Sequence, residues 1–200
     1  LTSLAGVGVA FKLAQGVLER YDKLNYSYEI LPFVTVGTIA DIVPLIGENR
    51  YFVTKGLELI AQGKHYGLKR MLDVAGVNLD NGLTSEQIGF TVAPRINASG
   101  RLDTVDAAIK LMTSENKQEI EMAIITLENY NKLRQQLCAE TFEQADECWK
   151  ATGMRDNAVI LFNKDWHIGI IGIVASKFVE KYYKPAFIMT YSEENKQFRC

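Results

Sequence analysis

The segment from Ser114 to about Thr152 contains neither glycine nor proline, and its apolar residues recur every three or four positions. This spacing predicts one continuous helix, which at 1.5 Å per residue would be roughly 55 Å long, longer than a small domain is wide. A coiled coil and a connector between two domains both fit the pattern, and we favour the connector because polar residues flank the stripe. The stripe comprises Ile120, Ile124, Leu127, Tyr130, Leu133, Leu137, Thr141, Ala145 and Trp149.

The composition limits the class of protein. Two hundred residues with 48% hydrophobic content predict one or two folded domains. The net charge of −2, from 22 basic and 24 acidic residues, excludes a polycation, so contact with nucleic acid would need a local basic site. Three cysteines without metal-binding spacing, and no apolar run of membrane-spanning length, favour a cytoplasmic protein that does not bind membranes.

Strand and helix patterns alternate after Gly153. A strand (157–163), a loop (164–169), a helix ending near Tyr183 and a second strand (185–191) follow one another. This order predicts a βαβ unit with two parallel strands and a right-handed crossover. A turn and the start of a further strand follow, and the chain begins almost within a helix, so we expect a fragment of a longer protein.

Helices are predicted before the long segment. The first, over 4–24, has Phe11, Leu13, Val17 and Leu18 on its apolar side. Residues 33–45 are rich in β-branched side chains, which favours a strand, but their apolar spacing favours a helix that Pro44 stops. The remaining expected helices cover 49–63, 66–76, 84–92 and 104–113. Thr84 and Gln87 form a capping box at the start of the third of these, and Pro94 is expected to end it.

The stretch APRINASGRL places Arg95, Asn97, Ser99 and Arg101 within seven residues, and its residues 95–100 would then form a loop. Arginine suits bidentate recognition of phosphate, and Gly100 allows close approach of a ligand to the backbone. A polar turn with two solvated arginines is the structural alternative.

Two further positions are candidates for a functional site. Asp41 lies among apolar residues, where its spacing alone favours a helix-end cap or a partner for a buried arginine. The functional alternative is a ligand for Mg²⁺ or Mn²⁺. His167 precedes Gly169 at a helix start, whose free N–H groups attract phosphate. The structural alternative is that the glycines let this helix pack closely on the sheet and that His167 is an ordinary loop residue. His65 is expected to be an exposed loop residue.

Four stretches, residues 4–15, 37–50, 88–102 and 166–186, resemble the RecJ family of single-strand-specific exonucleases in the DHH phosphoesterase superfamily. The APRINASGR and WHIGIIGIVAS motifs are specific to this branch, and the four stretches follow the family's order. The resemblance implies an α/β fold: the C-terminal part of a DHH domain (1–113), a long connecting helix (114–152) and an incomplete, βαβ-containing DHHA1 domain (153–200).

The resemblance also implies the chemistry, which is Mn²⁺- or Mg²⁺-dependent 5′→3′ hydrolysis of single-stranded DNA in recombination and repair. Asp41 matches a catalytic metal ligand, while Arg101, with Arg95, Asn97 and Ser99 in the same motif, and His167 with Gly169 match substrate-binding positions. The active site would lie in the cleft between the two domains, with the other metal ligands before Leu1 and a phosphate-binding motif after Cys200. A single-strand-binding protein and a helicase are the implied partners, and the fragment alone is expected to be inactive.

Two alternatives remain open. One is a DHH phosphodiesterase acting on short oligoribonucleotides or cyclic dinucleotides, because the superfamily shares its metal chemistry. The other is a DHH-like scaffold that binds nucleic acid without cutting it. The long connector and the APRINASGR motif favour the exonuclease.

Overall fold

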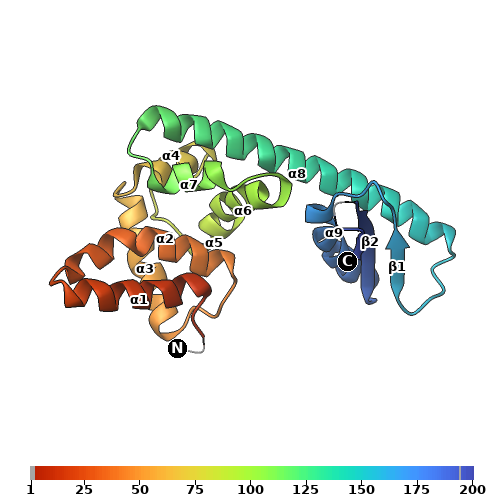
Figure 1. The fold of residues 1–200 in the computed structure, drawn as a ribbon, viewed down its shortest axis with the longest axis horizontal. Coiled ribbons are helices and arrows are strands. Elements are labelled where there is room, and N and C mark those ends of the chain that lie inside the picture. Colours follow the sequence, from red (N-terminus) through yellow and green to blue (C-terminus); the bar gives the residue numbers. More distant parts are fainter. Residues whose placement is uncertain (1–2, 194) are drawn as a thin grey trace. The chain divides into compact units, whose positions relative to one another are not determined.

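A computed structural model describes residues 3–193 and 195–200 and shows a helix-rich α/β protein with three strands near the C-terminal end (Figure 1). The chain divides into two compact units. Unit 1 comprises Leu1–Ser99 with Thr104–Glu128, and unit 2 comprises Gly100–Asp103 with Asn129–Cys200.

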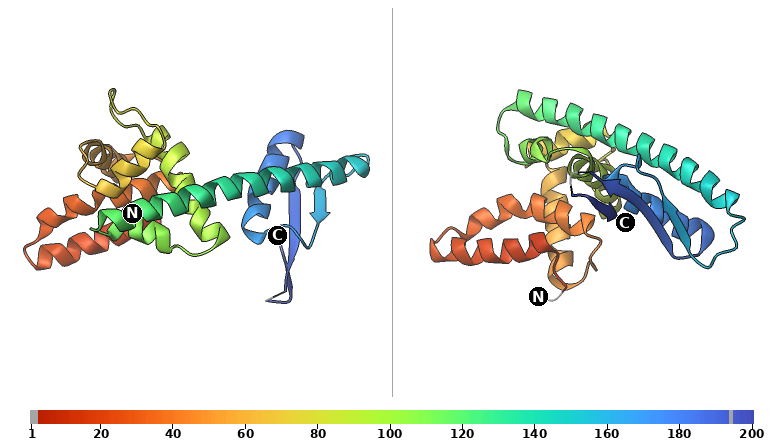
Figure 2. Two further views of the ribbon diagram at one scale, coloured as in Figure 1. Left: turned by 90° about the horizontal axis from the view of Figure 1, so that it is seen from above. Right: turned by 45° about the vertical axis from the view of Figure 1, so that its right-hand side comes forward.

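Helical elements form all of the regular structure in the described part of unit 1. In chain order they are α1 (Gly6–Arg20), η1 (Leu24–Tyr26), α2 (Ser27–Ala40), α3 (Gly47–Ala61), α4 (Tyr66–Val74), α5 (Ser85–Gln87), η2 (Ile88–Val92), α6 (Ala93–Leu102), α7 (Asp106–Thr113) and the start of α8 (Lys117–Ala151). In both views of Figure 2, α1 and α2 run side by side. The main core of unit 1 gathers apolar residues from α2, α3, α4, η2, α7 and α8.

The ambiguous segment after residue 33 is helical, as favoured from its spacing, but α2 ends at Ala40 and not at Pro44 as expected. Its strand-like composition follows from burial on several sides, because Val34, Thr35 and Val36 are all buried. The Thr35 hydroxyl donates a 3.0 Å hydrogen bond to the carbonyl oxygen of Phe52 on α3. A β-branched run in a fully packed helix therefore imitates a strand.

Helix α1 buries less of its apolar side than the pattern suggests. Phe11 is buried and meets the ring of Phe52 at 4.9 Å between centroids. Leu13 and Val17, in contrast, are 72% and 50% exposed. In the described part of the chain, the small apolar cluster beneath α1 includes Phe11 but neither Leu13 nor Val17.

The expected loop over residues 95–100 is wrong, because α6 covers this stretch. The preceding turn, η2, is a π-helix in which the Ala93 N–H bonds to the carbonyl oxygen of Ile88, five residues back. This wider spacing changes the hydrogen-bond register just before Pro94, which has no N–H to donate, so the helix continues through the proline. The capping box of Thr84 and Gln87 is confirmed by both of its hydrogen bonds.

Unit 2 contains the predicted βαβ unit. Strand β1 (Val159–Phe162) is parallel to β2 (Ala186–Ser192), and α9 (Ile168–Tyr182) connects them. Strand β3 (Gln197–Arg199) pairs antiparallel with β2, giving the sheet order β1-β2-β3. A core that includes Trp149 of α8 and Phe178 of α9 covers one face of this sheet.

The long helix predicted from the sequence is α8, whose 35 residues correspond to about 52 Å. The apolar stripe of α8 is buried near both ends of the helix. Its buried members are Ile120, Ile124 and Leu127 in unit 1 and Ala145 and Trp149 in unit 2. No helix in the described part of the chain is both long and apolar enough to cross a lipid bilayer.

Candidate nucleic-acid and metal-binding residues

Arg101, in the last turn of α6, contacts the first turn of α9. Its exposed guanidinium donates a 3.2 Å hydrogen bond from Nη1 to the carbonyl oxygen of Gly169. A Cβ atom built on Gly169 would stand 2.1 Å from the carbonyl oxygen of Arg101, a distance that only glycine tolerates. Two motifs 68 residues apart thus meet within unit 2.

His167 is the N-cap of α9. Its Nδ1 accepts a 3.1 Å hydrogen bond from the Gly169 N–H, so Nδ1 carries no proton in this arrangement. The first turn of a 15-residue helix is the positive end of its dipole. The N–H groups of Gly169, Ile170 and Ile171 all bond to His167, which corrects the expectation of free N–H groups at this helix start. The Arg101 guanidinium and the helix dipole remain as the features that favour an anion such as phosphate.

Two contacts hold the chain around Arg101 in place within unit 2. Leu102 packs against the unit 2 core. Asp103 accepts a 2.5 Å hydrogen bond from the Tyr130 hydroxyl on α8. Sequence reasoning assigned Tyr130 only to the apolar stripe, and the pairing carries no local signal because the two residues lie 27 positions apart.

The other polar side chains of the APRINASGRL stretch differ in their surroundings. Arg95 forms an ion pair with Glu128 of α8, and its Nη1 donates a 2.7 Å hydrogen bond to the carbonyl oxygen of Thr91. Ser99 is buried, and its hydroxyl donates to the carbonyl oxygen of Ile96 at 2.7 Å. Asn97 is exposed. Solvent therefore reaches Asn97 and Arg101 most freely.

Asp41 follows the last residue of α2 and is exposed. No hydrogen bond or ion pair joins its carboxylate to a residue within 3–193 or 195–200. An unpaired carboxylate is a suitable oxygen ligand for Mn²⁺ or Mg²⁺. The described residues hold no group of three histidine, cysteine, aspartate or glutamate side chains that could bind a metal ion. Asp41 thus fits one ligand position of such a site but does not complete it.

His65 is not an exposed loop residue, which corrects the expectation from the sequence. Its half-buried ring caps α4, with Nδ1 accepting a 3.1 Å hydrogen bond from the Leu68 N–H. Nε2 lies 2.8 Å from the carbonyl oxygen of Met112, to which it donates because the other ring nitrogen accepts. The glycines around His65 suggested a loop, whereas the ring fixes the start of a helix.

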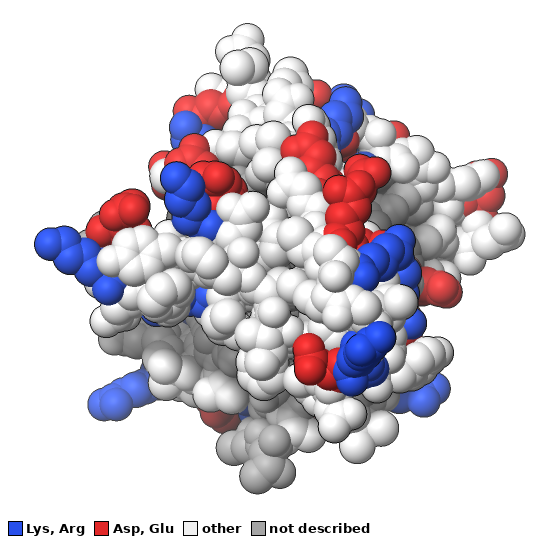
Figure 3. Space-filling model, turned by 90° about the vertical axis from the view of Figure 1, so that its right-hand side faces the viewer, with Lys and Arg blue, Asp and Glu red and all other residues white. Residues whose placement is uncertain are grey.

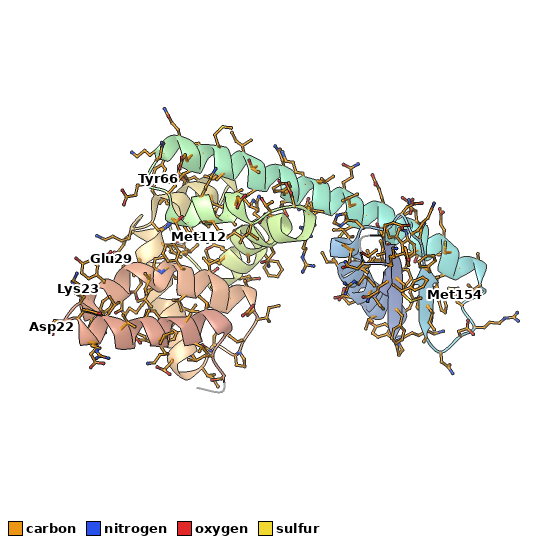
Figure 4. The ribbon with its side chains drawn as sticks, viewed as in Figure 1. Asp22, Lys23, Glu29, Tyr66, Met112 and Met154 are labelled. Carbon is orange, nitrogen blue, oxygen red and sulfur yellow. The ribbon has the colours of Figure 1, made fainter. Side chains whose placement is uncertain are left out.

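The surface charge of one face and one cavity in unit 1 bear on where a ligand could bind. On the face shown in Figure 3, basic and acidic side chains are interspersed. A cavity of about 880 Å³ in unit 1 is lined from α2, α4 and α7 by Glu29, Tyr66 and Met112, among others (Figure 4). His65 lines this cavity, whereas Asp41, Arg101 and His167 do not.

Comparisons with known proteins identify curated relatives that share one name. No family model matches the chain. The single-stranded-DNA-specific exonuclease RecJ of Bacillus subtilis is 38% identical over 191 residues, which covers 96% of this chain and 24% of the relative. RecJ of Escherichia coli is 33% identical over 198 residues, covering 92% of this chain and 34% of the relative.

Solved structures agree. The Mn²⁺ complex of RecJ from Thermus thermophilus superimposes with a TM-score of 0.80 at 31% identity, covering 92% of this chain and 27% of that one. A second structure, of exonuclease RecJ bound to manganese, gives a TM-score of 0.77 at 32% identity, covering 90% of this chain and 45% of that one. The α/β fold class expected from the sequence is confirmed.

The chain is therefore related over nearly its whole length to a class of nucleases whose solved structures contain a divalent metal ion. That class is RecJ, and the chain corresponds to one part of such a protein. It spans 24% to 36% of the length of the curated relatives that it matches.

Proposed function

We propose that the parent protein of this chain is a divalent-metal-dependent exonuclease that degrades single-stranded DNA from the 5′ end in recombination and repair. The observation that carries the proposal is the contact between Arg101 and Gly169, which places a free guanidinium face beside the N-terminal turn of α9. Such a pair attracts a phosphate group. The likeness to RecJ supplies the reaction and the substrate.

Each candidate residue has a separate role in this proposal. Arg101 binds a backbone phosphate, and His167 with Gly169 shapes the helix end beside it. These contacts position the strand without reading its sequence, since phosphates carry no base information. The exposed Asn97 side chain contacts the same DNA strand. Arg95 and Ser99 stabilise α6 and so hold Arg101 in place.

The metal requirement enters through Asp41. We assign its carboxylate to one ligand position for Mn²⁺ or Mg²⁺, with the remaining ligands supplied by parts of the parent outside these 200 residues. When bound, a pair of such ions supplies an activated water and stabilises charge on the phosphoryl oxygens. Because the described residues hold no complete metal site, the 200-residue chain alone is inactive.

The wider assignments belong to the same proposal. Residues 1–113 are the end of a DHH domain, 114–152 the connecting helix, and 153–200 the start of a DHHA1 domain. The parent acts in the cytoplasm, in keeping with three free cysteines. Single-stranded DNA is its substrate, and a single-strand-binding protein and a helicase are its expected partners.

Substitution of Asp41 in the parent tests the proposal. Asp41→Asn should lower metal-dependent nucleotide release from single-stranded DNA by at least about 100-fold, because losing residues that merely orient metal ligands already costs about 10–100-fold. Asp22→Asn is the matched control, since Asp22 is also an exposed aspartate just after a helix. Asp22 is labelled in Figure 4.

Three results would contradict the proposal. Wild-type rates in Asp41→Asn would remove Asp41 from the metal site. Faster turnover of dinucleotides than of long single strands by the parent would indicate the oligonucleotide phosphodiesterase instead. Metal-dependent nucleotide release by the purified 200-residue chain would show that its metal site is complete.

A further inference from the structure

The loop between α2 and α3 begins with a strained residue directly after Asp41. Asp41 follows the last residue of α2, and the next residue, Ile42, has a φ of 54°. This left-handed region is unfavourable for a β-branched side chain, so the conformation persists only where the surrounding structure enforces it. The Ile42 side chain is 89% exposed and gains almost no packing of its own. The constraint on this loop therefore comes from contacts made by its other residues.

Asn49, in the first turn of α3, makes such a contact. Its side chain is completely buried, and Nδ2 donates a 3.0 Å hydrogen bond to the carbonyl oxygen of Pro44 in the loop. The same Nδ2 donates a 2.7 Å hydrogen bond to the carbonyl oxygen of Ser3, shortly before α1 begins. One amide group thus joins the loop after Asp41 to the start of α3 and to the chain that enters α1.

Stability alone does not explain a buried amide at this position. The Oδ1 atom of Asn49 is buried and has no hydrogen-bond partner among the described residues. A buried acceptor without a partner costs free energy, which reduces the net stability gained from the two hydrogen bonds of Nδ2. The distinctive contribution of the amide is directional, because its two hydrogen bonds fix where the carbonyl groups of Ser3 and Pro44 point.

Asp41 is the functional candidate whose position depends on this loop. On one side its backbone is held by α2, since the Asp41 N–H donates a 3.0 Å hydrogen bond to the carbonyl oxygen of Gly37. On the other side its backbone continues into the loop that Asn49 fixes. We propose that Asn49 is a positioning residue, which acts through residues 42–46 to orient the Asp41 carboxylate for binding Mn²⁺ or Mg²⁺. This inference rests on the role proposed above for Asp41.

Titration of the parent protein with Mn²⁺ tests the positioning role without measuring nuclease activity. Electron paramagnetic resonance reports the Mn²⁺ that remains free, and hence the affinity of the protein for the ion. Asn49→Ala should weaken Mn²⁺ binding by about 10–100-fold, the range typical of removing a residue that orients a metal ligand.

Thr35→Val is the matched control for a loss of stability. It removes a buried hydrogen bond between the same two helices, from the Thr35 hydroxyl on α2 to the carbonyl oxygen of Phe52 on α3. Both variants should lower the melting temperature of the parent, because each leaves a buried carbonyl group without its donor. Only Asn49→Ala should weaken Mn²⁺ binding. Equal weakening in the two variants would overturn the proposal, since lost stability would then explain the effect.

Ile42→Gly is a second variant, in case Asn49→Ala does not fold. Glycine adopts a φ of 54° without strain, and the exposed Ile42 side chain leaves no cavity, so the melting temperature should be kept or raised. Mn²⁺ binding should nevertheless weaken, because glycine gives the loop other accessible conformations. Unchanged Mn²⁺ affinity in folded Asn49→Ala, or in Ile42→Gly where Asn49→Ala does not fold, would overturn the proposal.

Asp41→Asn, titrated in the same way, separates this inference from the proposed function. Weaker Mn²⁺ binding in Asp41→Asn, with wild-type binding in Asn49→Ala, would show that the positioning role alone is wrong. Wild-type Mn²⁺ binding in Asp41→Asn would overturn both, because Asp41 would then not be a ligand. Weaker binding in Asp41→Asn and in Asn49→Ala, but not in Thr35→Val, is the expected result.

Discussion

The carbonyl oxygen of Arg101 occupies the space that a side chain at Gly169 would need, 2.1 Å from the position of its Cβ. The same two residues share the hydrogen bond from the Arg101 guanidinium to the Gly169 carbonyl oxygen. Backbone packing and side-chain bonding thus fix the end of α6 against the start of α9. The position of the proposed phosphate-binding guanidinium depends on a glycine in another motif.

Gly169→Ala should therefore destabilise unit 2 by about 1–3 kcal/mol, since a backbone oxygen must move to admit the methyl group. Gly172→Ala, one turn further along α9, is the matched control because nothing lies within 4 Å of its Cβ. That substitution should leave stability unchanged or raise it by up to about 1 kcal/mol. Urea unfolding followed by circular dichroism measures both, and equal effects would contradict the close approach.

Removal of Glu128 should cost stability because it leaves the Arg95 guanidinium without its carboxylate partner. The two side chains are only 16% and 19% exposed. We expect Glu128→Ala to lower the free energy of unfolding by about 1–3 kcal/mol, between the values typical of exposed and buried pairs. Lys55→Ala, which breaks an exposed pair with Glu58, should cost less than about 0.5 kcal/mol. Similar losses in the two variants, measured by thermal unfolding, would count against a structural role for Arg95.

Asp146 on α8 should make the stability of unit 2 depend on pH. Burial opposes ionisation of its carboxyl, but hydrogen bonds from Lys150, Lys181 and Tyr182 outweigh that effect and hold its pKa well below the ordinary value. Because the pKa of this carboxyl is lower in the folded state, its ionisation stabilises the fold at any pH above the unfolded-state pKa of about 3.9. That stabilisation is lost as the pH falls from about 3.9 toward the folded-state pKa.

Unfolding measured between pH 7 and pH 2 checks this expectation. Wild-type stability should fall below about pH 4, and Asp146→Asn should flatten that part of the profile because the amide does not titrate. If the two proteins lose the same stability between pH 4 and pH 2, other carboxyl groups cause that loss of stability.

The regular parts of the fold follow from the sequence because their signals are local. The periodicity of α8 and the alternation of strand and helix after Gly153 both reflect side-chain spacing along one element. The capping box at Thr84 is equally local. Pro94 misled the prediction because the π-helical turn before it removes the usual penalty of a proline within a helix.

The sequence indicates the candidate residues, whose binding role stays a prediction, but it does not indicate their partners. Arg95 and Arg101 look alike in the sequence, yet one pairs with Glu128 and the other contacts Gly169, 33 and 68 positions away. Such contacts depend on packing that local patterns do not encode. Leu13 and Val17 show the same limit, because their exposure depends on what packs against α1.

The salt dependence of single-strand binding by the parent protein tests the central claim most directly. If Arg101 binds a backbone phosphate, Arg101→Ala should weaken binding and make the slope of log K against log salt concentration shallower by about 0.7, the value for one phosphate contact on a single strand. Arg155→Ala is the control, because Arg155 is exposed and precedes β1, whereas α9 begins after the other end of that strand. Loss of affinity with a shallower slope for Arg101→Ala, and neither change for Arg155→Ala, is the predicted result. An unchanged slope and affinity for Arg101→Ala across the titration would contradict the account.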